Sequence, residues 1–465
     1  MSNFSVKDDF KSSIVVFLVA LPLCLGIALA SGAPLISGIV AGVVGGIVIG
    51  FLSDSPVSVS GPAAGLTVIV SAGIIQHQGF SNFGIVVMLA GFIQLVLGLI
   101  KAGGHADLFP QATIRGMLAA IGLTLIIKQA PVALGKNQWS EIFNGVDLGI
   151  VTVSVISMAI ILGWEPLAKK FGGALKIIPG QLIAVLVGVI LNIKFQFVDS
   201  KNLVNVPHDI IGAFKFPDFH YFNSNVILTA FTIAIVASIE TLLCTDAADA
   251  MLASRKKTNK NRELVAQGVG NFVSGLLGGL PLTAVIVRTS TNIAAGGKSK
   301  FSSIFHGFWL LGCVLLIPGL LNKIPLATLS CILLVVGYKL TKPALYLDMA
   351  KRDAGQFTAF MVTIVAILTT DLLKGIMIGL VLAFILEIKK FSGVLFEAKV
   401  EGKTMVITFK KDISFFHKRS IMKALEDQEI EKVIFQNFNG VKKHIDIKET
   451  IDLYAKDNLN LEIVS

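Results

Sequence analysis

Long stretches of this chain are apolar and carry almost no charged side chain. Residues 12–52 contain no Asp, Glu, Lys or Arg. Over the whole chain, hydrophobic residues make up 54% and charged residues 15%, a balance shifted well towards apolar residues from that of soluble domains. Uncharged runs of this length are typical of helices that cross a lipid bilayer. The sequence therefore predicts an α-helical polytopic membrane protein.

Apolar runs of about 17 to 25 residues, the length that spans a bilayer, divide the membrane region into two halves. The first half contains predicted spans at 12–31, 35–53, 60–76, 82–101, 112–130, 147–164 and 175–193. After a polar segment at 194–225, the second half contains spans at 226–250, 262–279, 282–295, 301–319, 322–340, 356–372 and 374–391. We therefore predict about 14 spans, seven in each half, with the third and the tenth unusually short.

One apolar span in each half is interrupted by a short extended stretch that leads into a helix. The first interruption, at 57–66, contains Gly61 and Pro62, and the second, at 278–288, contains Pro281. Interrupted spans at corresponding positions of two halves are typical of a secondary transporter with a substrate site at the membrane midplane. Because each half-helix directs unpaired amide groups into the membrane centre, two such ends favour an anion.

Four clusters of basic residues fall in every second loop between the predicted spans. The clusters are Lys169/Lys170/Lys176, Arg255/Lys256/Lys257/Lys260/Arg262, Lys298/Lys300 and Lys339/Lys342/Lys351/Arg352. With a cytoplasmic N-terminus, all four clusters lie on the cytoplasmic side, as the positive-inside rule requires. We expect a multi-pass protein of the cell inner (cytoplasmic) membrane, with both termini cytoplasmic. This bias accounts for the formal charge of +10, so the charge does not indicate a nucleic-acid partner.

The chain changes character after residue 391. Alternating apolar residues predict strands at 395–400, 404–409, 432–436 and 459–464, and amphipathic patterns predict helices at 416–427 and 446–456. This β-β-α-β-α-β order describes a small α/β unit. We therefore divide the chain into a membrane domain at 1–391 and a short cytoplasmic domain at 392–465.

Several short motifs follow the predicted spans in a fixed order. They are Ala20-Leu21-Pro22, Ser60-Gly61-Pro62-Ala63-Ala64, Leu108-Phe109-Pro110, Ile114-Arg115-Gly116, Ser238-Ile239-Glu240-Thr241-Leu242-Leu243, Asn271-Phe272, Ser274-Gly275, Pro281-Leu282-Thr283, Arg288-Thr289 and Asn292. Their order and spacing resemble the SulP family of inorganic anion transporters (solute carrier family 26), with a shortened C-terminal STAS domain. The resemblance covers nearly the whole chain.

The resemblance implies a fold and a transport cycle. The fold is an inverted repeat of seven plus seven spans, in which a core domain (spans 1–4 and 8–11) moves against a gate domain (spans 5–7 and 12–14). The protein would be a homodimer that works by elevator-like alternating access. Its inorganic anion would lie between the N-termini of the third and tenth half-helices, where the interrupted spans already predict a site.

The candidate substrate-binding residues belong to these two half-helices: Ser60, Gly61, Ala63, Ala64, Thr283, Ala284 and Arg288. We expect Ser60 to cap the third helix, with Pro62 in its first turn. Arg288 would lie one and a half turns into the tenth helix, face the core interior and contribute positive potential. The alternative is structural, because Ser60 can end a buried loop and Thr283 can bond back to its own helix.

Glu240 and Cys244, in the eighth span, are the candidate residues for a coupling ion. A carboxyl group deep in an apolar span favours its neutral form, so a proton or cation could neutralise Glu240. The alternative is a static Glu240–Arg288 ion pair that fixes the packing. Sodium-coupled members of the resembled family use hydroxyl or backbone ligands near Cys244, Ala284 and Ile286. Because a thiol and two apolar side chains suit a hard cation poorly, proton coupling or uncoupled exchange competes with sodium coupling.

The expected function is secondary transport of a small inorganic oxyanion, with sulfate and bicarbonate both open. The sequence shows no catalytic constellation, metal spacing or cofactor motif, so we expect neither an enzyme nor a cofactor. A nucleobase permease of the same fold is one alternative, although it would place paired acids in the eighth and tenth spans. A sensor signalling through the tail is another, although Asp446 is followed by Ile447 rather than a phosphorylatable residue.

Overall fold

The computed structural model describes residues 6–104, 110–171, 178–195, 198–207, 216–252, 257–351, 354–370, 372–388, 396–401, 404–409, 432–436 and 461–464. The chain divides into two compact units. The first contains Met1–Gly103 and Ile121–Leu340, and the second contains Gly104–Ala120 and Thr341–Ser465. Each unit is described by itself.

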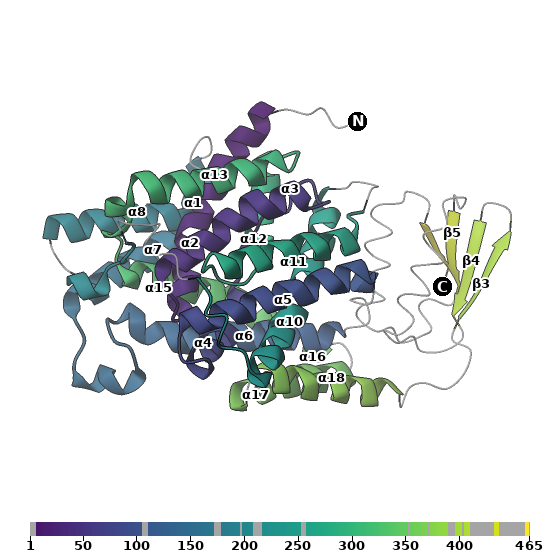
Figure 1. Ribbon diagram of the computed structural model, residues 1–465. Coiled ribbons are helices and arrows are strands. Elements are labelled where there is room, and N and C mark those ends of the chain that lie inside the picture. Colours follow the sequence, from purple (N-terminus) through teal and green to yellow (C-terminus); the bar gives the residue numbers. More distant parts are fainter. Residues whose placement is uncertain are drawn as a thin grey trace. The chain divides into compact units, whose positions relative to one another are not determined.

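The first unit is helical apart from two short strands (Figure 1). Its α-helices are α1 (Val6–Ala30), α2 (Leu35–Val44), α3 (Gly50–Leu52), α4 (Thr67–Gln76), α5 (Phe80–Leu99), most of α6 (Gln111–Ala133), α7 (Leu148–Phe171), α8 (Gly180–Phe195), α10 (Ser224–Leu252), α11 (Lys260–Leu276), α12 (Ile286–Ala294), α13 (Phe301–Leu316), α14 (Pro318–Leu321) and α15 (Leu326–Leu340). A π-helical turn, η1 (Gly45–Ile49), joins α2 to α3. Every span predicted between residues 12 and 340 overlaps one of these helices.

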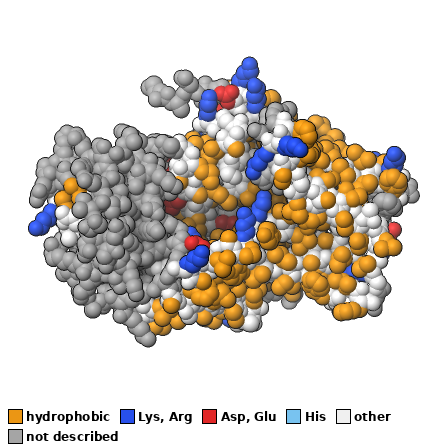
Figure 2. Space-filling model, turned by 180° about the vertical axis from the view of Figure 1, so that it is seen from behind, with side chains coloured by type: hydrophobic (Ala, Val, Ile, Leu, Met, Phe, Trp, Pro, Cys, Tyr) orange, Lys and Arg blue, Asp and Glu red, His pale blue; other side chains and the backbone are white. Residues whose placement is uncertain are grey.

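Seven helical segments of the described chain are long and apolar enough to cross a membrane. They are Val6–Ala30, Leu35–Leu52, Phe80–Leu99, Gln111–Ala133, Leu148–Phe171, Ser224–Leu252 and Leu326–Lys351. Figure 2 shows hydrophobic side chains over much of the described surface, with Lys and Arg gathered in a few places. Large apolar side chains such as Phe92 (53%), Val155 (62%) and Ile190 (59%) are exposed. Such surfaces are stable against lipid rather than water.

Helices α5 and α11 pack backbone against backbone, and they run side by side in Figure 1. A Cβ atom at Gly268 of α11 would lie 2.5 Å from the backbone nitrogen of Leu95 in α5, and one at Gly275 would lie 2.6 Å from that of Met88. Small residues allow such close approach between membrane helices, whose association depends on van der Waals packing rather than on the hydrophobic effect. The glycines therefore fix α11 against α5.

The start of α1 is bonded to the loop between α12 and α13. The buried Asp9 carboxylate accepts the backbone N–H groups of Lys298 at 2.8 Å and Ser299 at 3.0 Å. Asp8 forms an ion pair with the Lys298 ammonium at 2.8 Å. Its hydrogen bond and charge raise the pKa of Lys298. The first helix is thus attached to the second half of the chain.

The second unit contains the first residues of α6, three helices and a four-stranded sheet. The helices are α16 (Pro343–Lys351), α17 (Ala354–Thr369) and α18 (Leu372–Ile388), and the sequence did not predict α16. The strands β3 (Phe396–Glu401), β4 (Thr404–Phe409), β5 (Lys432–Gln436) and β6 (Leu461–Val464) pair in that order. β3–β4 is antiparallel, and β4–β5 and β5–β6 are parallel. All four predicted strands are present, and the predicted helices at 416–427 and 446–456 lie outside the described residues.

The α5–α11 contact predicts the effect of adding one methyl group. Gly268→Ala should lower the free energy of unfolding by about 1 to 3 kcal/mol, because the added carbon meets the backbone of α5, which cannot rotate away. Gly312→Ala in α13 is the matched control, because no atom lies within 4 Å of its Cβ position. Thermal unfolding in detergent should show a change only for Gly268→Ala, and equal unfolding temperatures for the two variants would contradict this packing.

Candidate anion-binding site

The two interrupted spans meet in a short antiparallel ribbon. Strand β1 (Ser60–Pro62) pairs with strand β2 (Leu282–Ala284), with Ser60 opposite Ala284 and Pro62 opposite Leu282. From β1 the chain passes through the 3-10 turn η2 (Ala64–Leu66) into α4, and from β2 it passes directly into α12. Two short helices, 10 and 9 residues long, therefore follow two paired strands.

Side chains of neighbouring elements complete the hydrogen bonds of this ribbon. Thr241 of α10 accepts the N–H of Ala284 at 3.2 Å, and Thr289 of α12 accepts that of Val59 at 3.1 Å. The N–H of Val285 bonds to the carbonyl of Val59 at 3.0 Å. In a membrane interior each buried backbone group needs such a partner. The amide groups that remain without an intrahelical acceptor are those at the start of η2 and at the start of α12, because the N–H groups of Leu66 and Thr67 already bond to Ala63 and Ala64.

The structure corrects the prediction that Ser60 caps the third helix. Ser60 lies inside β1 with 1% of its surface exposed, and its hydroxyl accepts a hydrogen bond from Gln267 of α11 at 2.7 Å. Pro62 also lies in β1, so it is not in the first helical turn. Thr283 is fully buried, and its hydroxyl donates to the carbonyl of Ala284 at 3.1 Å. Both hydroxyl groups therefore bond within the protein.

The other predicted site residues differ in exposure. Ala63 and Ala284 are each 1% exposed, whereas Ala64, at the start of η2, is partly exposed. Ile286 and Val287, in the first turn of α12, are each 38% exposed. The accessible part of the site therefore includes Ala64 at the start of η2 and the first turn of α12.

Arg288 is the third residue of α12 rather than one and a half turns into it, because the helix begins at Ile286. Its side chain is fully buried. One terminal nitrogen donates to the Cys24 thiol at 3.4 Å, while Nε and the other terminal nitrogen have no partner among the described residues. A Cβ atom at Gly61 would overlap this guanidinium, so the charge lies directly against β1. A positive charge is thus held beside the ribbon.

Glu240 of α10 lies beside the start of the other half-helix. A Cβ atom at Gly65 in η2 would be only 2.6 Å from its Oε2. This oxygen has no hydrogen-bond partner among the described residues, although the side chain is partly exposed. Cys244, one turn along α10, is 5% exposed and contacts the Thr289 hydroxyl at 3.7 Å. The Glu240 carboxyl group therefore lies beside the start of η2 and α4.

The alternative of a static Glu240–Arg288 ion pair is wrong. Within the described part of the chain, neither side chain forms an ion pair, and the two charges lie against different glycines, Gly65 and Gly61. The sequence suggested the pair because both charges fall in apolar spans. Only the fold shows that α10 and α12 direct them to separate places.

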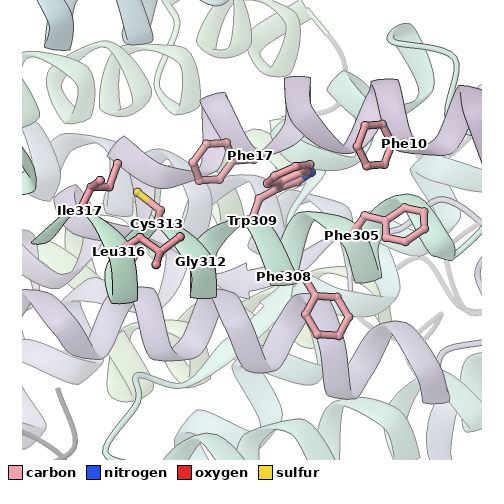
Figure 3. Close-up of a pocket in the computed structure, with 9 residues that line it drawn as sticks. All are labelled: Phe10, Phe17, Phe305, Phe308, Trp309, Gly312, Cys313, Leu316 and Ile317. Atoms are coloured by element: carbon pink, nitrogen blue, oxygen red, sulfur yellow. The ribbon is translucent and has the colours of Figure 1, made fainter.

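A groove between α1 and α13 is a different kind of site (Figure 3). Its volume is about 520 Å³, and its walls include Phe10, Phe17, Phe308 and Trp309. The polar N–H of Trp309 is already donated to Ser13 at 3.1 Å. Because the described lining carries no charged side chain and is almost entirely apolar, with the weakly polar Cys313 thiol, it does not suit an inorganic anion.

The sulfate permease family model matches residues 6–363 of the chain. The chain belongs to this family. "Putative sulfate transporter YvdB" of Bacillus subtilis is 30% identical over 404 residues, which cover 83% of this chain and 74% of the relative. The bicarbonate transporter BicA of Picosynechococcus is 27% identical over 416 residues, covering 83% and 71%.

Two solved structures share the fold. The transmembrane domain of a cyanobacterial bicarbonate transporter BicA has a TM-score of 0.70 at 25% identity, covering 82% of this chain and 98% of that chain. The structure of SLC26A9 has a TM-score of 0.74 at 14% identity, covering 99% and 85%. The chain therefore has the helical polytopic fold of these transporters.

Sequence reasoning missed the residues that hold the ribbon. Thr241 and Thr289 belong to motifs of the resembled family but were not predicted as site residues, and neither was Gln267. One signal was available, because Glu263, Gln267, Asn271 and Ser274 recur every three or four residues in an otherwise apolar span. Such a pattern predicts a buried polar face on one side of a helix.

The contact between Arg288 and Gly61 gives a test of the site. In Gly61→Ala the added methyl group would overlap the Arg288 guanidinium, which is packed tightly because it is fully buried. The overlap should lower the free energy of unfolding by about 1 to 3 kcal/mol. Anion uptake by the protein that still folds should fall at least about tenfold. Gly163→Ala in α7, where no atom lies within 4 Å of the Cβ position, should change neither property. Normal uptake by Gly61→Ala would contradict this placement of Arg288.

Proposed function

We propose that this protein is a secondary transporter of a small inorganic oxyanion, either sulfate or bicarbonate. The observation that carries the proposal is the antiparallel β1–β2 ribbon, from whose opposite ends the two half-helices start. Membership of the sulfate permease family and the similarity to YvdB and BicA support it.

The physical argument for an anion rests on three sources of positive potential. The first residues of η2, which continues into α4, and of α12 present amide groups without an intrahelical acceptor, and each helix end acts as a partial positive charge. Arg288 adds a full positive charge that no described carboxylate neutralises. A compact oxyanion can accept several N–H bonds at once. A neutral nucleobase would gain little from this potential.

Glu240 supplies a means of coupling. When it is ionised, its negative charge lies beside the same half-helix end that would bind the anion, and the two negative charges repel. A proton or cation at Glu240 removes this repulsion, so each ligand increases the affinity for the other. We therefore infer that Glu240 links the anion to a co-ion, and that a proton suits the site better than sodium because Cys244 is a soft ligand.

The transport cycle and the topology complete the proposal. Each of the fourteen predicted spans overlaps a helix of the described chain, and fourteen crossings would return both termini to the cytoplasm. We propose an inverted seven-plus-seven repeat with core and gate domains, elevator-like movement, and a homodimer in the inner membrane. The four strands of the tail support a short STAS-like domain.

Uptake into proteoliposomes tests the substrate and the co-ion together. Radiolabelled sulfate and bicarbonate should be offered separately, with sodium and proton gradients imposed one at a time. We expect one of the two oxyanions to accumulate, and an inward proton gradient to increase its uptake. Protein-free liposomes are the control. Accumulation of a nucleobase, and of neither oxyanion, would reject the proposal.

Glu240→Gln tests the coupling role. The variant should fold and bind the anion, because Glu240 has no ion pair with Arg288 to lose, but its uptake should no longer depend on the imposed gradient. Asp246→Asn, on the same helix, removes the carboxylate that pairs with Lys260 at 3.0 Å and should keep the gradient dependence. Gradient-dependent uptake that survives in stable Glu240→Gln protein would exclude Glu240 as the coupling acid.

A further inference from the structure

Helix α11 carries four polar side chains on one buried face. Glu263, Gln267, Asn271 and Ser274 are separated by four, four and three residues, and all four are 0% exposed. At this spacing they lie on one side of the helix. Buried polar groups in a membrane protein need partners, and the partners here belong to the two interrupted spans.

Asn271 bonds to β2 as a neighbouring strand would. Its amide nitrogen donates to the carbonyl of Leu282 at 2.9 Å, and its amide oxygen accepts the N–H of Leu282 at 2.8 Å. The same nitrogen donates to Oε1 of Gln94 in α5 at 2.7 Å. Ser274 donates to the carbonyl of Leu280, just before β2, at 2.7 Å. The C-terminal half of α11 therefore holds the strand that leads into α12.

Gln267 and Glu263 hold the other interrupted span. Gln267 donates to the Ser60 hydroxyl in β1 at 2.7 Å. Glu263 accepts a hydrogen bond from Ser53 at 2.7 Å, in the segment that leads to β1. The N-terminal half of α11 therefore holds the strand that leads into α4. One helix is bonded to both strands of the ribbon.

We propose that Asn271 and Gln267 are positioning residues of the anion site. Through β2 and β1 they set the direction in which the first amide groups of α12 and α4 point. The inference rests on the proposed function, but neither residue touches the anion, because both are fully buried behind the ribbon. Because N–H bonds to an anion are directional, a small rotation of either strand weakens binding while both helices remain folded.

The matched control is a second asparagine with the same bonding. Asn322, between α14 and α15, accepts the N–H of Val206 at 2.6 Å and donates to its carbonyl at 2.8 Å. Val206 and Asn322 lie outside the interrupted spans. A purely structural role would give Asn271→Ala and Asn322→Ala the same phenotype, namely a lower unfolding temperature with unchanged affinity.

The experiment measures half-saturation and maximal rate of sulfate and bicarbonate uptake in proteoliposomes. Asn271→Ala and Gln267→Met should raise the half-saturation concentration at least about tenfold, with a smaller change in the maximal rate. Asn322→Ala should leave it within about twofold. Asn271→Leu keeps a similar volume and loses both bonds to Leu282 without adding a charge, so it carries the test should Asn271→Ala fail to fold. An unchanged half-saturation concentration in folded Asn271 variants overturns the inference.

Hydrogen exchange of the anion-free protein gives a second measurement that needs no transport. The backbone amides of residues 282–289 should exchange faster in Asn271→Ala than in the unsubstituted protein, and Asn322→Ala should not change them. Equal exchange in a folded Asn271→Ala variant overturns the positioning role even where its half-saturation concentration is raised. Absence of oxyanion uptake by the unsubstituted protein instead rejects the proposed function, so the two failures are distinguishable.

Discussion

The pairing of β1 with β2 is the interaction on which the candidate site depends. Extended backbone inside a membrane is costly unless every polar group has a partner. Here the strands satisfy one another along one edge, and Asn271 and Thr241 bond to the outer edge of β2. The ribbon is therefore stable where a lone extended segment would not be, and a short helix starts from each of its two ends.

Two glycines, one in the ribbon and one just after it, explain how two opposite charges can lie nearby. Gly61 leaves room for the Arg288 guanidinium, and Gly65 leaves room for the Glu240 carboxyl group. Because the two charges do not pair, they can act differently. Arg288 always carries its charge, whereas Glu240 can lose its charge to a proton. In the transport role proposed above, the site would combine a permanent attraction for an anion with one that depends on a co-ion.

The two helices that support the ribbon do so by different means. Helix α2 and its π-helical turn bring Gly45 against the carbonyl of Ser60, and the carbonyl of Ser37 accepts the N–H of Leu280 at 3.2 Å. Helix α11 instead uses Gln267 and Asn271 side chains. Backbone packing fixes the distance between α2 and the ribbon, and directional hydrogen bonds fix the position of the two strands along α11. Together they hold the ribbon in one arrangement.

The sequence by itself determined the helical membrane class, the location of the membrane helices other than α16, the points of interruption and the four strands of the tail. These follow from local composition and periodicity, which a short window contains. The tertiary structure alone decided that Ser60 lies in a strand, that Glu240 and Arg288 stay apart, and that Gln267 bonds to Ser60. The last of these contacts joins residues 207 positions apart. A local pattern shows that a buried polar group needs a partner, but only the fold decides which partner it meets.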